Sequence, residues 1–322
     1  MPVHDDLGLR MKSNYEMRAR SYLTRRTPVI IRIDGKAFHS FTKGFKKPYD
    51  KLLMTCMQET MKYLCEHIQG CVLGYTQSDE ISLLLIDYKK LTSDSWFDYQ
   101  VQKICSISAS MATMQFNRIF NDSMCGISPK IQGRYSLEEF ENNIEKFKLE
   151  EPDIYSDLEK YDLLNYLDPE DPSKYRELED LCDAYWKANE KGAMFDARCF
   201  NIPPEEVTNY FFWRQEDATR NSIQMAGQAY FSHKQLMNKS CNMIQDMLHE
   251  EKGINWNDYP TDFKRGSCCI KLKFTQKTIM ENGQPCDKTA YRNRWIIEHD
   301  IPRFVNEARD YIDSLLLPEV EE

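Results

Sequence analysis

The chain has 322 residues, of which 41% are hydrophobic, enough to form a sizeable core in one large domain or two small ones. It contains no apolar run of about 18 residues, and the polar residues 1–20 lack the apolar part of a signal peptide, so neither a membrane span nor export is predicted. The eleven cysteines are scattered without a C-x-x-C pair, which argues against a zinc site or a disulfide framework and favours the cytoplasm.

The net charge of −9 is unevenly distributed along the chain. The segment 137–191 holds 18 acidic and 7 basic residues, a net charge of −11, which leaves +2 for the rest. We call residues 137–191 the acidic segment. Its prolines and charge predict an inserted, mainly helical and solvated appendage whose deletion leaves activity intact. The remaining chain is then able to present a basic face to phosphates.

Strand and helix patterns alternate in the first part of the chain. The β-branched run at 29–33 ends at Asp34-Gly35, which predicts a strand followed by a turn. Helical spacing of apolar residues predicts a helix over 50–67. Two short apolar runs, 71–76 and 81–86, flank a polar tetrapeptide and predict a hairpin.

A long helix over 96–120 and a strand over 193–202 complete the order β-α-β-β-α-β, which is the ferredoxin-like arrangement. We therefore predict an α+β fold. Residues 1–136 and 192–202 form its first domain, and the acidic segment interrupts that domain. Residues 203–322 form a C-terminal region that begins with helices and continues with a strand over 267–275 and a final helix over 301–317.

Acidic residues stand at two strand ends that this fold brings together. The first and third strands of a ferredoxin-like sheet are neighbours, so Asp34 is expected to face Asp79 and Glu80, and these three are the candidate catalytic residues. Two carboxylates that share divalent cations with substrate phosphates are the usual magnesium arrangement. For each motif taken singly, an ordinary turn is the alternative. Arg32 shares a strand face with Asp34 and is predicted to pair with Asp79 or a phosphate.

The residues after Asp34 have the features of a phosphate cradle. Gly35, Lys36, Ala37, Phe38 and His39 offer successive backbone N–H groups and a cation. The P-loop pattern is absent, and this signal taken alone is weak.

Several motifs resemble those of the tRNA-His guanylyltransferase family. IIRIDGKAFHSF at 30–41 resembles its first motif, GFKKPYD at 44–50 its N-F-x-K-P-x-D element, and YTQSDEIS at 75–82 its Y-x-Q-S-D-E-x-S element. FDAR at 195–198, WRQED at 213–217 and KRG at 264–266 match later elements in the same order.

The resemblance implies a polymerase-like palm that works in the 3′-to-5′ direction. Asp34, Asp79 and the Gly35 carbonyl would bind two Mg²⁺ ions. ATP would activate the 5′ phosphate of a tRNA, and the 3′-hydroxyl of GTP would then attack it. A homodimer or homotetramer is also implied. The nucleotide would be held by Asp34, Gly35, Lys36, Ala37, Phe38, His39, Lys47, Ser78, Asp79, Lys103 and Asn221.

One departure indicates a branch of this family. Residues 218–225 read ATRNSIQM where eukaryotic members carry H-I-N-N-L-Y-N, and only the Asn221 position is kept. This version resembles the bacterial and archaeal guanylyltransferase-like proteins, which implies templated repair of truncated tRNA 5′ ends. Two alternatives remain: a palm-type nucleotide cyclase, although no G-G-D-E-F is present, and a non-catalytic RNA-binding module, although the aromatic pattern of that module is absent.

Overall fold

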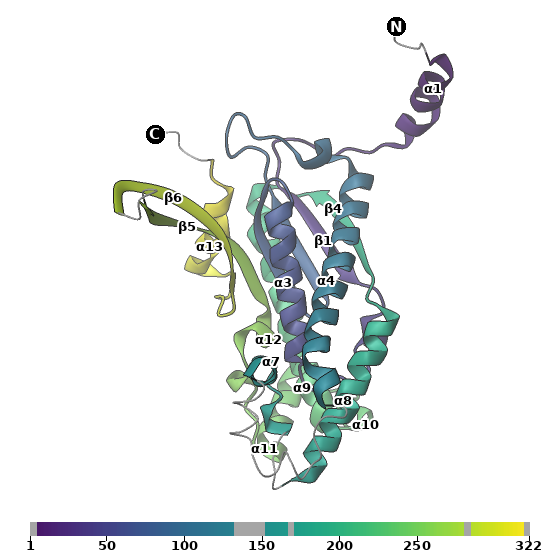
Figure 1. The fold of residues 1–322 in the computed structure, drawn as a ribbon, viewed down its shortest axis with the longest axis vertical. Helices are drawn as coiled ribbons and strands as arrows, with labels where there is room; N and C mark the ends of the chain where they lie inside the picture. Colours follow the sequence, from purple (N-terminus) through teal and green to yellow (C-terminus); the bar gives the residue numbers. More distant parts are fainter. Residues whose placement is uncertain (1–4, 132–151, 167–170, 280–284, 319–322) are drawn as a thin grey trace.

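The computed structural model describes residues 5–131, 152–166, 171–279 and 285–318 (Figure 1). Its centre is a six-stranded sheet in the order β4-β1-β3-β2-β5-β6, with every neighbouring pair antiparallel. Because β1 lies directly beside β3, the predicted contact between the first and third strands is confirmed. The strands are β1 Val29–Gly35, β2 Cys71–Gln77, β3 Glu80–Leu85, β4 Phe195–Asn201, β5 Ser267–Ile279 and β6 Pro285–Glu298.

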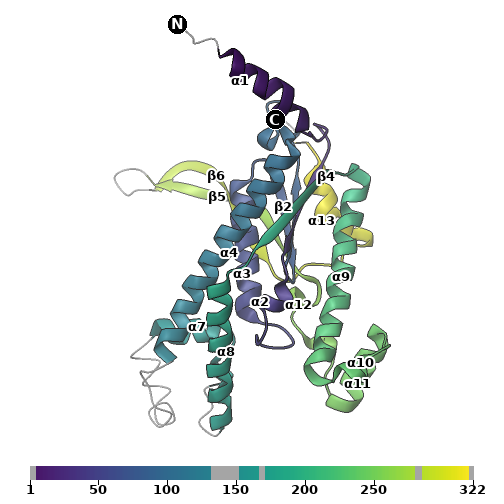
Figure 2. The ribbon, with the colours of Figure 1, turned by 90° about the vertical axis from the view of Figure 1, so that its right-hand side faces the viewer.

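Helices cover both faces of this mixed α/β fold (Figure 2). On one face lie α3 (Lys51–His67) and α4 (Val101–Ile131), and α7 (Pro152–Lys160) and α8 (Pro172–Lys191) pack against α4. On the other face lies α9 (Pro204–Tyr230). The shorter helices are α1 Asp6–Met11, α2 Phe38–Phe41, α10 His233–Leu236, α11 Cys241–Lys252, α12 Thr261–Arg265 and α13 Asp310–Asp313.

Strand β1 is buried on both faces, which explains its unbroken apolar run. Ile31 and Ile33 pack in the core with α3 and α4, whereas Ile30 packs with Val207 and Phe211 of α9. The alternation of a strand therefore turns Arg32 toward α9 as well. This face assignment decides the partners of Arg32 described below.

The order strand, helix, strand, strand, helix, strand is observed through β4, with the acidic segment before the last strand. The C-terminal strands extend the same sheet, because β5 pairs with β2 through Leu73–Ile270 to Thr76–Ser267. The predicted helix over 301–317 is wrong. That stretch holds only short turns, a 3₁₀ turn at Asn306–Arg309, α13, and a second 3₁₀ turn at Ser314–Leu316.

The described part of the acidic segment is not a solvated appendage, and that expectation is wrong for these residues. Leu158, Leu178 and Tyr185 are buried in the same core cluster as α3 and α4. Charge on one face of a helix hid an apolar stripe on the other, since Leu178, Leu181, Cys182 and Tyr185 recur at helical spacing. Residues 137–151 and 167–170 of the prediction lie outside the described residues.

Within the described residues, no helix is both long and apolar enough to cross a membrane. The ten cysteines that the structure describes are free thiols. Cys56 and Cys65 are buried in the core, whereas Cys105 is partly buried.

Candidate active site

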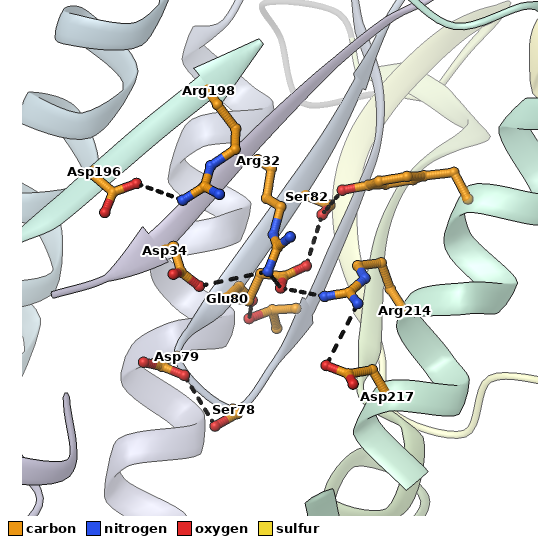
Figure 3. A network of polar contacts seen from close by, with 12 residues as sticks. Arg32, Asp34, Ser78, Asp79, Glu80, Ser82, Asp196, Arg198, Arg214 and Asp217 are labelled. Carbon is orange, nitrogen blue, oxygen red and sulfur yellow. Dashed lines mark hydrogen bonds and ion pairs between the residues drawn. The ribbon is translucent and has the colours of Figure 1, made fainter. Parts of the chain in front are cut away.

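The candidate site forms where the end of β1 meets the turn between β2 and β3. Asp34 is in register with Glu80 of β3 and with Asp196 of β4. The Gly35 N–H donates to the Asp79 carbonyl oxygen at 3.0 Å, which ties the turn to the end of β1. Asp34 and Asp79 therefore lie at one edge of the sheet (Figure 3).

Electrostatics at this edge favour a bound cation. The pKa of Asp79 is raised to about 6, chiefly by burial and further by the charges of Asp34 and Glu80. The Ser78 hydroxyl donates to Asp79 Oδ1 at 3.2 Å. Across the described ranges, no basic side chain forms an ion pair with Asp79. A divalent cation would relieve the repulsion between the two carboxylates.

The donors that this edge offers are carboxylate oxygens, a ligand type that Mg²⁺ takes in proteins. Asp34 and Asp79 offer carboxylate oxygens, and the described part of the chain contains no group of three or more His, Cys, Asp or Glu that could hold a metal. Mg²⁺ is usually bound through one or two carboxylates, with water and substrate phosphates as the other ligands.

A cavity of about 680 Å³ opens beside Asp79. One wall is the turn after β1, where Ala37 has the left-handed φ of 54° and redirects the chain. Another wall is the loop 42–50, which we call the cavity loop, and all nine of its residues line the cavity. A β-carbon on Gly35 would lie 2.3 Å from the Phe38 ring, so this tight approach requires glycine.

Most of the predicted nucleotide-binding residues converge on this cavity. Gly35, Ala37, Phe38, His39, Lys47, Ser78 and Asp79 line it. The Lys36 side chain is exposed and does not line it, and its N–H donates to the Met194 carbonyl oxygen at 2.8 Å. Asn221 of α9 lines a smaller adjoining cavity that shares Ser78 with the larger one.

Lys103 lies apart from the other predicted residues. It is exposed in the first turn of α4, with Nζ 5.5 Å from the centre of the Phe97 ring. The Val101 carbonyl beside it accepts from the thiol of Cys199, which is in register with Ile31 rather than with Asp34. The structure therefore does not bring Lys103 to the cavity.

Glu80 is a buried ion-pair residue and does not line the cavity. It is 3% exposed, and its Oε2 lies 2.6 Å from Arg32 Nη2 and 2.8 Å from Arg214 Nη1 (Figure 3). Arg214 Nη2 also lies 3.5 Å from Asp217. The predicted pairing of Arg32 with Asp79 is wrong, because strand alternation places Arg32 and Glu80 together on the α9 face.

Arg214 lies within the WRQED motif at 213–217, but the sequence patterns give it no role of its own. A signal was available, since Arg214 continues the buried stripe of α9 that includes Val207, Tyr210 and Phe211. An arginine in an apolar helix face needs an anionic partner. The partners of the cavity loop in the acidic segment, Tyr185 and Asp162, were also missed.

Known proteins resemble this chain in sequence and in fold. Residues 9–145 match the family model described as tRNAHis guanylyltransferase. A solved bacterial tRNA(His) guanylyltransferase-like protein in complex with ATP is 36% identical, with a TM-score of 0.66, and the match covers 97% of this chain and 100% of that one. The corresponding complex with GTP is 34% identical, with a TM-score of 0.64, over 97% and 99% of the two chains. A probable tRNA(His) guanylyltransferase of Dictyostelium discoideum is 23% identical over 84% of each chain.

Proposed function

Because this chain belongs to the tRNA(His) guanylyltransferase family and is therefore a nucleotidyltransferase, we propose that it adds nucleotides to the 5′ end of tRNA in the 3′-to-5′ direction. The observation that carries the proposal is the cavity next to the acidic edge, whose walls combine the Asp79 carboxylate with the exposed lysines Lys43 and Lys47. Such a combination suits a triphosphate that shares a cation with carboxylates.

The residues of the site would have two roles, to bind the charged groups and to position them. Asp34, Asp79 and the Gly35 carbonyl would hold two Mg²⁺ ions, which would lower the pKa of the attacking hydroxyl and neutralise phosphoryl oxygens. Lys47 and the backbone of residues 37–39, which line the cavity, would bind the phosphates. Ser78 steadies the Asp79 carboxylate through its hydroxyl.

We assign nucleoside triphosphates to the cavity. The likeness to a protein solved with ATP and with GTP supports this assignment, since both matches span nearly the whole chain. We also interpret β1 to β4 and their helices as a polymerase-like palm of the ferredoxin-like kind, an interpretation that rests on the strand order β4-β1-β3-β2. Assembly into a homodimer or homotetramer stays a prediction.

The test of catalysis is transfer of labelled GTP to a tRNA with a 5′ monophosphate, with and without Mg²⁺. Asp34→Asn and Asp79→Asn are expected to reduce transfer at least a hundredfold in single turnover, since each removes a metal ligand. Glu205→Gln is the control, because Glu205 is an exposed acid in the first turn of α9. Transfer near the wild-type rate in either aspartate variant would refute the site assignment.

We further propose that the preferred reaction is templated repair. Metals and phosphate ligands do not read the base, so base choice would come from pairing with the opposite strand of the acceptor stem. An unsatisfied base edge costs about 1–3 kcal/mol, or roughly a factor of five to 150. A tRNA that lacks its first 5′ nucleotide should therefore be extended with the complement of the facing base.

A competition between truncated tRNA and intact tRNA-His, with each of the four nucleotides, tests this preference. Faster extension of the truncated tRNA by the complementary nucleotide supports repair. Equal use of all four nucleotides, or preference for intact tRNA-His, would contradict it.

A further inference from the structure

The cavity loop is held from behind by the acidic segment. Asp50, at the end of the loop, accepts from three donors: the Lys46 N–H at 3.1 Å, the Leu53 N–H at 2.9 Å and the Tyr185 hydroxyl of α8 at 2.7 Å. Asp50 is 4% exposed and Tyr185 is 1% exposed. One buried carboxylate therefore joins the loop, the start of α3 and α8.

Tyr185 is the hydrogen-bond donor in its contact with Asp50. Burial raises the pKa of Tyr185, and the charge of Asp50 raises it further, so the phenol stays protonated and donates. Burial also raises the pKa of Asp50, although the three donors partly oppose that shift.

A second contact fixes the middle of the cavity loop. Lys46 Nζ donates to both Asp162 Oδ2 at 2.8 Å and the Asp162 carbonyl oxygen at 2.9 Å. The same ammonium lies 5.6 Å from the centre of the Tyr166 ring. The neighbouring Lys47 is exposed and lines the cavity without any such contact among the described residues.

Apolar packing completes the attachment. The Phe45 ring meets the Tyr185 ring edge-on at 4.8 Å. Gly44 approaches α8 so closely that an added β-carbon would lie 2.9 Å from that of Ala184. Three successive loop residues, Gly44, Phe45 and Lys46, thus contact the acidic segment, whereas Lys47 forms no hydrogen bond, ion pair or ring contact with the described part of that segment.

We propose that Tyr185 and Asp162 are positioning residues for nucleotide binding, and that of the two adjacent lysines Lys46 anchors the cavity loop while Lys47 binds the phosphates. This inference rests on the proposed function of the cavity. It assigns the acidic segment to the active site, in place of the dispensable appendage that its charge suggests.

The first test uses two buried tyrosines of the same segment. Tyr185→Phe removes the hydroxyl that reaches Asp50, whereas the control Tyr161→Phe removes one that donates to Ser123 of α4 at 2.8 Å. Nucleotide transfer to truncated tRNA is measured over a range of nucleotide concentrations. Tyr185→Phe should raise KM for the nucleotide about fivefold or more with kcat within about twofold. Tyr161→Phe should change only thermal stability, and an equal KM in the two variants would overturn the role of Tyr185.

The second test separates the two lysines by a double-mutant cycle. Lys46→Met and Asp162→Asn should each raise KM for the nucleotide, and the double variant should be no worse than the poorer single variant. Lys47→Met should combine with Asp162→Asn in a nearly multiplicative way, because these residues share no contact. Asp180→Asn, an exposed acid of α8, controls for the lost charge. If the effects of Lys46→Met and Asp162→Asn on KM multiply in the double variant, the anchoring role of Lys46 is refuted.

The two proposals fail in different ways. Wild-type protein that neither binds GTP with Mg²⁺ nor transfers it would refute the proposed function. Wild-type protein that transfers GTP, together with Tyr185→Phe and Asp162→Asn variants of unchanged KM, would refute only the positioning role. If Tyr185→Phe does not fold, the cycle on the exposed Lys46–Asp162 contact decides alone.

Discussion

The buried ion pair between Glu80 and Arg214 allows the effect of substitutions on stability to be predicted quantitatively. Among the described residues, Glu80→Gln leaves Arg214 with only the Asp217 carboxylate at 3.5 Å and Arg32 with only the Asp34 carboxylate at 3.9 Å. Removing one partner of a buried ion pair costs about 3–5 kcal/mol. Arg214→Met should cost less, about 1–3 kcal/mol, because Glu80 keeps Arg32 at 2.6 Å.

The assay is thermal and urea unfolding of the two single variants and their combination. For a chain of this length, 1 kcal/mol corresponds to roughly 1.5 °C in Tm, so Glu80→Gln should lower Tm by about 4–7 °C. The double variant should lose less than the sum of the single variants, since only one arginine then lacks its carboxylate. The control is Glu216→Gln. Glu216 lies on the same helix as Arg214, and its substitution breaks an exposed ion pair with Arg303, which should cost less than about 1 kcal/mol.

Glu80→Gln should lose more unfolding free energy than Arg214→Met. If Arg214→Met destabilises the protein as much as Glu80→Gln does, the remaining ion pair with Arg32 is not enough to stabilise the buried Glu80 carboxylate. A loss below about 1 kcal/mol in Glu80→Gln would show that the network does not hold α9 to β3.

Two further predictions concern the acidic edge and its turn. The pKa of Asp79 is about 6 in the folded chain against an ordinary 3.8, so the folded state binds more protons, and the free energy of unfolding of the metal-free protein should fall as pH rises from about 4 to about 6. Asp79→Asn should remove this fall and raise stability at pH 7 by about 2–3 kcal/mol, as unfolding at several pH values measures; an unchanged pH profile would contradict it. Gly35→Ala should lower Tm and weaken GTP binding, because the new methyl group meets a Phe38 ring already packed against Phe41 and Phe195, and calorimetry with GTP and Mg²⁺ showing wild-type affinity would refute this.

The sequence predicted the central strands because their patterns are local. The run at Val29–Gly35 and the hairpin around Asp79 owe their form to β-branched residues and turn residues that lie next to each other. Strand β6 was missed because its sequence begins with charged and polar residues, and it pairs with β5 along an extended ribbon. The helix expected over 301–317 is broken into turns because Asn306 has a left-handed φ of 52°, although the buried Ile301, Phe304 and Ile312 have the spacing of one helix face.

The candidate site was predictable where it follows from neighbouring strands. Asp34 and Asp79 meet because β1 lies beside β3, and a recognisable strand order implies that contact. Partners that come from distant helices were not predictable in this way. Tyr185 reaches Asp50 across 135 positions, and Arg214 reaches Glu80 across 134, so only the packing of α8 and α9 reveals them.

The pairing of β1 on both sides has a consequence for how the site moves. The backbone amides around Asp34 belong to a strand bonded to β3 and β4, so they should exchange with solvent hydrogen only when the whole sheet opens. The cavity loop has no such pairing, and its Lys46 amide is protected by the Asp50 carboxylate alone. The acidic edge is thus expected to be the more rigid part of the site, whereas the position of the cavity loop depends on its side-chain contacts with Tyr185 and Asp162.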